Sequence, residues 1–161
     1  MSSEPTLQSA VERMMPSEAT ELADSRKGRV RVIVVTPERA VLDDTAELVI
    51  LPMIDGELGV LPGRAPLIGR LGAGELRLMK SGRATQRLFV EAGFVQVRSN
   101  VVTVLTSKTE EAAAITAAMA AAAEAEAEAL PASNARERAT KEKARDRARG
   151  LKKVAAKNTV A

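Results

Sequence analysis

Hydrophobic and polar residues alternate with a period of two through much of the chain after residue 29. Val30, Val32 and Val34 share one side of the first run, which Thr36-Pro37 ends. Because successive side chains of a strand point to opposite faces, this alternation is typical of a half-buried β-strand. Similar short runs follow over residues 41–42, 46–51, 75–80, 83–91, 94–98 and 101–105. Many short strands at this spacing predict an antiparallel β-sandwich or barrel.

Turn residues separate these runs. Ser81-Gly82 and Ser99-Asn100 each lie between two runs, as in tight two-residue hairpins. Pro52 is expected to end the third strand, because proline cannot donate to a ladder of hydrogen bonds. Residues 56–66 are so rich in glycine and proline that we expect a loop there.

The periodicity changes to a helical one after residue 106. The sequence S-K-T-E over residues 107–110 has the form of a helix capping box. Alanine, the best helix former, then dominates as far as Leu130, and Pro131 stops the helix. The sequence therefore predicts an alanine-rich helix from about residue 109 to residue 130.

A second helix is predicted over about residues 134–157, with Ser133 as its cap. Small residues recur along it every three to five positions and form a narrow stripe on an otherwise charged helix. Gly150 is expected to weaken it by about 1 kcal/mol relative to alanine. Because the connection is short, the two helices should form an antiparallel hairpin.

Large apolar residues divide the chain into parts. Within residues 109–161 they are limited to Ile115, Met119, Leu130, Leu151, Val154 and Val160. That segment cannot build a core of its own, whereas residues 29–108 can. The predicted organisation is a disordered extension over residues 1–28, a β-sandwich over residues 29–108 and a helical hairpin over residues 109–161. The extension lacks the continuous apolar stretch of a secretory signal.

Charge is distributed unevenly between the two predicted helices. Residues 109–130 carry five acids and no base, whereas residues 131–161 carry ten bases and three acids. Opposite charges on neighbouring helices suit a pair that associates, but exposed ion pairs contribute only about 0–1 kcal/mol each. We therefore expect a marginal hairpin that docks and opens at a cost of a few kcal/mol. A basic tail also leaves open an alternative, a β-sandwich adaptor with a nucleic-acid-binding helical tail.

Several residue types are missing, and their absence excludes classes of function. The 161 residues include no cysteine, histidine, tryptophan or tyrosine, and two phenylalanines. Disulfides, cysteine or histidine zinc sites, and nucleophiles paired with histidine are therefore impossible. No glycine-rich phosphate-binding motif is present either. These absences predict a protein that is not catalytic by itself and has no cofactor or metal.

One segment resembles a known family closely. The sequence G-E-L-G-V-L-P-G-R-A-P over residues 56–66 is similar to the G-E-L-G-x-L-P-G-H-A-P signature of the epsilon subunit of F-type ATP synthases. Three further stretches resemble its first and last sandwich strands: V-V-T-P-E at 34–38, F-V-E-A-G-F-V-Q-V at 89–97 and V-V-T-V-L at 101–105. The resemblance covers about residues 29–108 in order.

The resemblance implies an antiparallel β-sandwich followed by a two-helix hairpin, in a non-catalytic subunit of the central rotor. In that family the sandwich contacts the gamma subunit and the ring of c subunits, and the subunit couples proton translocation to ATP synthesis. The helices can reach the alpha and beta subunits and restrain ATP hydrolysis. The implied location is peripheral, on the cytoplasmic face of the bacterial inner membrane and held there by the complex; a plastid thylakoid fits less well.

Contact candidates carry over from the family's pattern to two groups of residues. Those on the rotor side are Glu57, Leu58, Gly59, Pro62, Gly63, Arg64 and Pro66. Arg64 stands where the family has histidine, so any role of that histidine is in doubt here. Those on the side of the catalytic subunits are Arg136, Arg138, Lys141, Arg145, Arg149 and Lys152.

Each group has an ordinary structural explanation beside the functional one. Gly56, Gly59 and Gly63 can serve turns that need positive φ, and the prolines can set the shape of the loop. The basic residues can form a solvated face paired with Glu137, Glu142 and Asp146 at helical spacing.

A nucleotide motif of some family members is degenerate in this chain. The motif I-D-x-x-R-A corresponds to residues 115–120, where Thr116 replaces the acid and Met119 replaces the arginine. A hydroxyl and a thioether supply no charge for phosphate or ribose. The resemblance therefore implies weak ATP binding or none, and Ile115 and Met119 are expected to pack as apolar residues.

Overall fold

Ten strands form one continuous sheet in the computed structural model, which describes residues 28–160. Apart from Gly28, the predicted N-terminal extension lies outside the described residues. The strands are β1 (Val30–Val35), β2 (Ala40–Ala46), β3 (Leu48–Met53), β4 (Gly56–Val60), β5 (Leu67–Leu71), β6 (Gly74–Lys80), β7 (Arg83–Val90), β8 (Gly93–Arg98), β9 (Val101–Thr106) and β10 (Thr109–Glu111). They are followed by a 3-10 turn (Ala112–Ala114) and the helices α3 (Ala117–Ala129) and α4 (Ala135–Val160).

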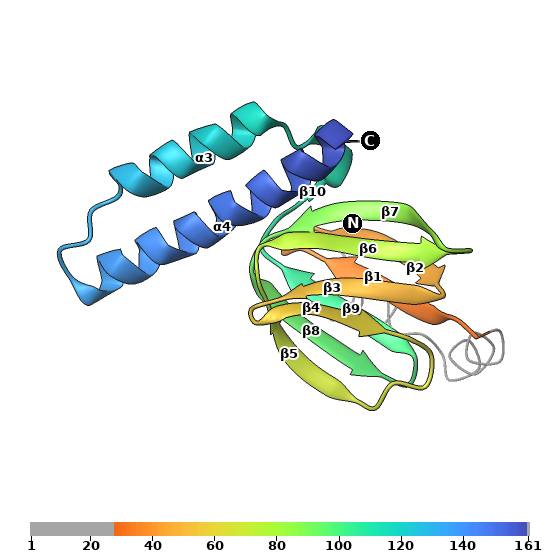
Figure 1. The fold of residues 1–161 in the computed structure, drawn as a ribbon. Coiled ribbons are helices and arrows are strands. Elements are labelled where there is room, and N and C mark those ends of the chain that lie inside the picture. The colour runs from red at the N-terminus through yellow and green to blue at the C-terminus, as the bar shows by residue number, and fades with distance from the viewer. Residues whose placement is uncertain (1–27, 161) are drawn as a thin grey trace, which may run out of the picture.

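The sheet curls into a sandwich, as the sequence predicts (Figure 1). Its strand order is β10-β7-β6-β3-β5-β8-β9-β1-β2, with β4 paired to β3. The pairs are antiparallel except β1 with β9, so the expectation of a wholly antiparallel sheet is wrong at that one pair. Valines and leucines from the inward positions, among them Val32, Leu51 and Leu76, fill the core.

Two predicted hairpin turns are confirmed. Ser81 and Gly82 have φ of 51° and 73°, and Ser99 and Asn100 have φ of 50° and 60°. Positive φ at both central residues gives the turn a twist that matches the twist of the flanking strands. These turns set the register of β6 against β7 and of β8 against β9.

Several strand boundaries differ from the prediction. Pro52 lies inside β3, because its carbonyl still accepts a hydrogen bond from Gly72 N at 2.9 Å. β2 extends to Ala46, because its two aspartates are paired: Asp43 with Arg31 at 2.7 Å and Asp44 with Lys80 at 2.9 Å. β5 has no counterpart in the prediction, and half of the expected loop over residues 56–66 is strand β4.

The first helix begins later than the capping-box motif predicts. Thr109–Glu111 forms β10, which pairs with Leu88, Phe89 and Val90 along the edge of β7. These residues therefore pair with the edge of β7 instead of forming the predicted first turn of a helix. α3 starts after Thr116, whose Oγ1 accepts a hydrogen bond from Met119 N at 3.2 Å.

The second helix also differs in its cap and its length. Its N-cap is Asn134 rather than Ser133: Asn134 Oδ1 accepts from Glu137 N at 2.9 Å, and Glu137 Oε2 accepts from Ser133 N at 2.8 Å. α4 continues to Val160 and so passes the predicted end. In Figure 1 the two helices lie side by side, the loop between them projects away from the sandwich, and the C-terminal half of α4 lies near β6.

Candidate functional site

Residues 56–66, the predicted rotor-side segment, form strand β4 and the loop that follows it. β4 pairs with β3 from Gly56 opposite Met53 to Val60 opposite Val49. Gly56 has φ of +142° and Gly63 has φ of +81°, so these two glycines serve positive-φ geometry as expected. Gly59 does not, and is an ordinary strand residue.

The loop is fixed to the neighbouring β8–β9 turn. Gly63 N donates to Asn100 Oδ1 at 2.7 Å, and Arg64 N donates to Leu61 O at 3.3 Å. Glu57 is exposed and forms an ion pair with Arg77 at 2.8 Å. Gly59, Gly63, Arg64 and Pro66 are exposed as well, whereas Leu58 and Pro62 are partly buried. The segment therefore presents a shaped surface on which Glu57 and Arg64 are the charged residues and Leu61 is 58% exposed.

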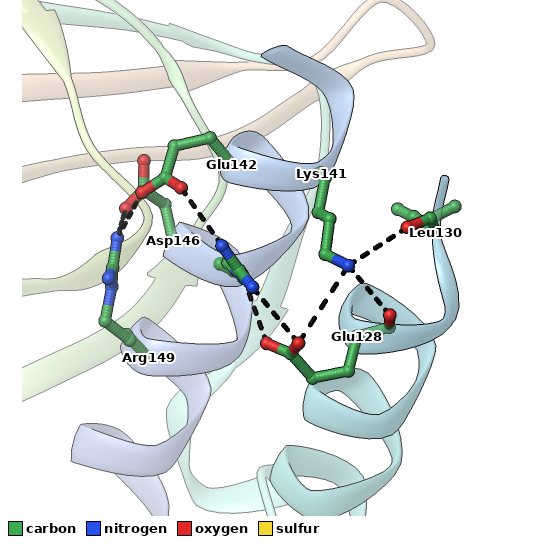
Figure 2. A network of polar contacts seen from close by, with 7 residues as sticks. Glu128, Leu130, Lys141, Glu142, Asp146 and Arg149 are labelled. Carbon is green, nitrogen blue, oxygen red and sulfur yellow. Dashed lines mark hydrogen bonds and ion pairs between the residues drawn. The ribbon is translucent and has the colours of Figure 1, made fainter. Parts of the chain in front are cut away.

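The helices of the hairpin are joined by charges at their distal end (Figure 2). Glu128 at the end of α3 accepts from Arg145 at 2.9 and 3.1 Å. Lys141 Nζ donates to the backbone carbonyls of Glu128 at 2.9 Å and Leu130 at 3.1 Å. A cation near the last carbonyls of a helix interacts favourably with its negative end. The expected contact between an acidic first helix and a basic second helix is thus present.

These contacts shift the ionisation of their members. The hydrogen bonds from Arg145 lower the pKa of Glu128 below its ordinary value, and the same pairing raises the pKa of Arg145. Arg149 contacts Asp146 and Glu142 of its own helix, which raises its pKa. Glu128, Glu142, Asp146 and Arg149 are exposed and Arg145 is only partly buried, so the pairs orient side chains more than they stabilise the hairpin.

The predicted basic residues therefore fall into two sets. Lys141, Arg145, Arg149 and Lys152 are engaged inside the hairpin, the last with Glu124 at 3.7 Å. Arg136 and Arg138 are exposed and form no ion pair within residues 28–160. The latter two are available for a partner without breaking an internal contact.

A second apolar core joins the hairpin to the sandwich. Phe89 of β7, Ala112, Ile115, Leu151 and Val154 are all buried in it. Two alanines of α3 and two of α4 complete the cluster: Ala120, Ala123, Ala148 and Ala155. Ile115 is buried as expected, but Met119 is not, because 36% of it is exposed.

Gly150 allows α4 to approach the sandwich closely. An added Cβ would lie 2.5 Å from the carbonyl oxygen of Ala73 and 3.1 Å from Phe89 Cε2. Both distances are below ordinary van der Waals contact. The residue that the sequence marks as a weak point of the helix is thus the point where the helix docks.

Ion pairs flank this contact. Glu75 of β6, with a side chain 2% exposed, accepts from Arg87 at 2.5 Å and from Lys157 of α4 at 2.7 Å. Arg147 of α4 donates to Glu91 at 2.6 Å. Burial by itself would raise the pKa of Glu75, but the hydrogen bonds from Lys157 and Arg87 outweigh it and lower the pKa. Glu75 is therefore an anionic anchor for the end of α4.

The end of α4 also holds the segment that links the sandwich to the hairpin. Asn158 Nδ2 donates to the carbonyls of Ala112 at 2.6 Å and Ile115 at 3.0 Å. Sequence reasoning missed Glu75, Glu91, Lys157 and Asn158, because their contacts join distant parts of the chain. The isolated Gly150 in a long helix was the one signal that could have indicated a packing role.

Together, the fold and these contacts define a β-sandwich protein with its own helical hairpin docked on β6 and β7. Residues 29–112 match the family model described as the ATP synthase delta/epsilon chain, β-sandwich domain. The chain therefore belongs to the family of ATP synthase delta/epsilon chains.

Relatives support the same family, and one of them matches a longer stretch than the sandwich. The chain is 47% identical over 121 residues to the ATP synthase epsilon chain of Rhodopirellula baltica, covering 75% of this chain and 94% of that one. It is 40% identical over 84 residues to the ATP synthase epsilon chain of Granulibacter bethesdensis, covering 52% of this chain and 62% of that one.

Solved structures share the fold. A chain of the Euglena gracilis mitochondrial ATP synthase superposes with a TM-score of 0.68 at 21% identity, covering 78% of this chain and 81% of that one. None of these matches supports the alternative of an adaptor with a nucleic-acid-binding tail. Within residues 28–160, no helix is both long enough and apolar enough to cross a membrane.

Proposed function

We propose that this chain is a non-catalytic central-stalk subunit of an F-type ATP synthase, which couples proton translocation to ATP synthesis. The observation that carries the proposal is the family match over residues 29–112, combined with the hairpin docked on that same domain. The charged contacts support a structural role. Glu75, the buried carboxylate among residues 28–160, is held by two cations rather than poised to exchange a proton.

The sandwich contacts the gamma subunit and the ring of c subunits in this proposal, through residues 56–66. The support is the exposure of Glu57 on β4, and of Gly63, Arg64 and Pro66 on a loop that hydrogen bonds hold in shape. Leu58 and Pro62 then support the loop from beneath. The location is peripheral, on the cytoplasmic face of a bacterial inner membrane, and is maintained by these partners rather than by lipid.

The hairpin restrains ATP hydrolysis through the alpha and beta subunits. Arg136 and Arg138 are the first candidates for an acidic partner surface, because they have no ion pair to give up. Lys141, Arg145, Arg149 and Lys152 can join only after exchanging internal partners. Long-range electrostatic attraction between a basic helix and an acidic surface falls with salt.

The test is ATP hydrolysis by an F-type ATPase that has been depleted of its epsilon subunit. The full chain should bind, as followed by gel filtration, and should slow hydrolysis. A version that ends after Ile115 keeps β10 and should bind without slowing hydrolysis. Arg136→Glu/Arg138→Glu in the full chain should bind and slow hydrolysis less than the wild type.

The matched control for these charge changes is Lys153→Glu, on an exposed residue of the docked half of α4. Circular dichroism and thermal melting of every variant report whether the sandwich is folded. A full chain that does not bind in a well-matched system would contradict the proposal. If the full chain and the truncated version both bind and neither slows hydrolysis, the proposed coupling role stands. The proposed restraint of ATP hydrolysis by the helices is then wrong.

A further inference from the structure

Charged side chains extend across the outward face of the sheet from the rotor-side segment to the end of α4. The strands there lie in the order β4, β3, β6 and β7 (Figure 1). Leu58, Leu76 and Leu88 face the core, so the positions that alternate with them on β4, β6 and β7 face outward. Five charged residues of this face and of the helix docked on it are called here the outer charge row: Glu57, Arg77, Glu75, Arg87 and Lys157.

Arg77 joins the rotor-side segment to the middle of the sheet. It lies opposite Ile50 of β3, and Glu57 lies opposite Pro52 on the other side of the same strand. The guanidinium of Arg77 reaches across β3 and donates to Glu57 Oε2 at 2.8 Å. Its Nε is buried and has no acceptor within residues 28–160. Arg77 therefore depends on Glu57 and has donor capacity to spare.

Arg77 also lies directly opposite Arg87 of β7. Side chains of such cross-strand neighbours interact, and like charges in these positions are destabilising. Each guanidinium is turned toward a different carboxylate, Arg77 toward Glu57 and Arg87 toward Glu75. The two carboxylates thus keep the two like charges apart.

Glu75 is the second carboxylate within reach of Arg77. The two residues are two positions apart on β6 and so share its outward face. Both oxygens of Glu75 are occupied, Oε1 by Arg87 at 2.5 Å and Oε2 by Lys157 at 2.7 Å. The side chain of Lys157 is 43% exposed and that of Arg87 is 30% exposed. Lys157 is therefore the cation that water replaces more readily when another guanidinium binds Glu75.

We propose that the outer charge row couples the rotor-side segment to the docking of α4. When a cationic or hydrogen-bond-donating group of a partner occupies the carboxylate of Glu57, Arg77 loses its acceptor. A largely buried guanidinium without an acceptor is costly, so Arg77 binds Glu75 and displaces Lys157. The end of α4 then loses its anionic anchor, and the hairpin is released more readily. The inference rests on the proposed function only for the partner that occupies Glu57.

The two states that the row connects are α4 docked on the sandwich and α4 released from it. Coupling between two sites is reciprocal. When α4 leaves, Lys157 leaves Glu75, and Arg77 gains access to that carboxylate. Glu57 is then held less firmly and binds a partner more readily, so release of the hairpin and engagement of the rotor-side segment favour each other.

The first measurement uses the full chain alone. Glu57→Gln removes the charge that holds Arg77 and keeps the size of an exposed side chain. Hydrogen-exchange protection of the amides of residues 151–158 should fall by about three- to tenfold, with an unchanged thermal midpoint of the sandwich. Glu38→Gln is the matched control, because it removes the same charge from an exposed residue between β1 and β2, and it should leave the protection unchanged.

A double-mutant cycle tests the route. Arg77→Gln removes the cation that would move, so adding Glu57→Gln to it should have no further effect on protection. Glu75→Gln removes the carboxylate that Arg77 would reach and provides a second background with the same expectation. Circular dichroism of each variant reports whether the sandwich is folded.

Two results would overturn the inference. One is protection in Glu57→Gln equal to that in the wild type. The other is an equal fall caused by Glu57→Gln in the wild-type, Arg77→Gln and Glu75→Gln backgrounds, which would show that the effect does not pass through the row. Either result would leave the proposed function intact, because no partner takes part in the experiment. A full chain that does not bind an epsilon-depleted F-type ATPase would instead contradict the proposed function and leave the coupling within the chain standing.

Discussion

Replacing Gly150 by alanine separates the strength of α4 as a helix from its docking on the sandwich. Alanine favours a helix over glycine by about 1 kcal/mol, and this gain applies whether α4 is docked or released. The added Cβ would lie 2.5 Å from Ala73 O and 2.9 Å from Ala73 C. Because backbone atoms cannot turn aside, α4 must move outward by about 1 Å to restore ordinary contact.

The clash affects the docked state alone. Overpacking of this kind costs about 1–3 kcal/mol, which shifts the docking equilibrium by about five- to 150-fold toward release. Gly150→Ala should therefore keep or raise helical circular dichroism. At the same time, it should lower the hydrogen-exchange protection of amides between Ala148 and Ala155.

A reverse variant provides the control. Ala139→Gly changes an exposed residue in the N-terminal half of α4, the half of the helix that leads away from the sandwich (Figure 1). It should lower helical content by the same propensity difference and leave the protection of the docked half unchanged. Unchanged or increased protection in Gly150→Ala would refute the account of Gly150 as a docking residue.

Three further predictions concern other parts of the chain. The pKa of Glu75 in the folded protein lies below its ordinary value of 4.5, so the ionised carboxylate should stabilise docking fully above pH 4.5. This stabilisation should be lost as the pH falls through the folded pKa. Glu75→Gln should remove the dependence on pH in a series of thermal melts. Gly93→Ala should lower the free energy of unfolding in urea by about 3 kcal/mol or more, because its Cβ would lie 1.9 Å from Leu105 O. Titration calorimetry should detect no ATP binding with a micromolar dissociation constant.

Each of these has a control or a contrary result. Lys153→Gln, on an exposed residue of α4, should keep the pH dependence that Glu75→Gln removes. Gly59→Ala meets a single side-chain atom at 3.4 Å and should be tolerated, so equal losses at Gly59 and Gly93 would contradict the steric argument. A micromolar ATP complex would show that the degenerate motif at Thr116 and Met119 still functions.

The strands and turns were predictable because their signals are local. Alternation with period two located β1, β6, β8 and β9 closely, and Ser81-Gly82 and Ser99-Asn100 gave the hairpins. Strands β4 and β5 were missed, because the glycines and prolines in residues 56–69 indicate a loop. The backbone of β4 nevertheless pairs with β3, and that of β5 pairs with β8. Pairing partners override local composition in such segments.

The docking contacts were not predictable from one sequence. Glu75 and Lys157 are 82 residues apart, and no periodicity relates them. The late start of α3 has the same origin, because Thr109–Glu111 is held by β7. By contrast, the complementary charges of the two helices could be read from composition, and Arg145 with Glu128 and Lys152 with Glu124 are pairs that resulted.

The measurement that tests the central claim most directly is proton-driven ATP synthesis by membrane vesicles whose F-type ATP synthase lacks its epsilon subunit. The account predicts that adding the full chain restores synthesis, and that the version ending after Ile115 also restores it while leaving ATP hydrolysis unrestrained. A full chain that binds the complex and restores no synthesis would contradict the claim that this protein couples proton flow to ATP formation.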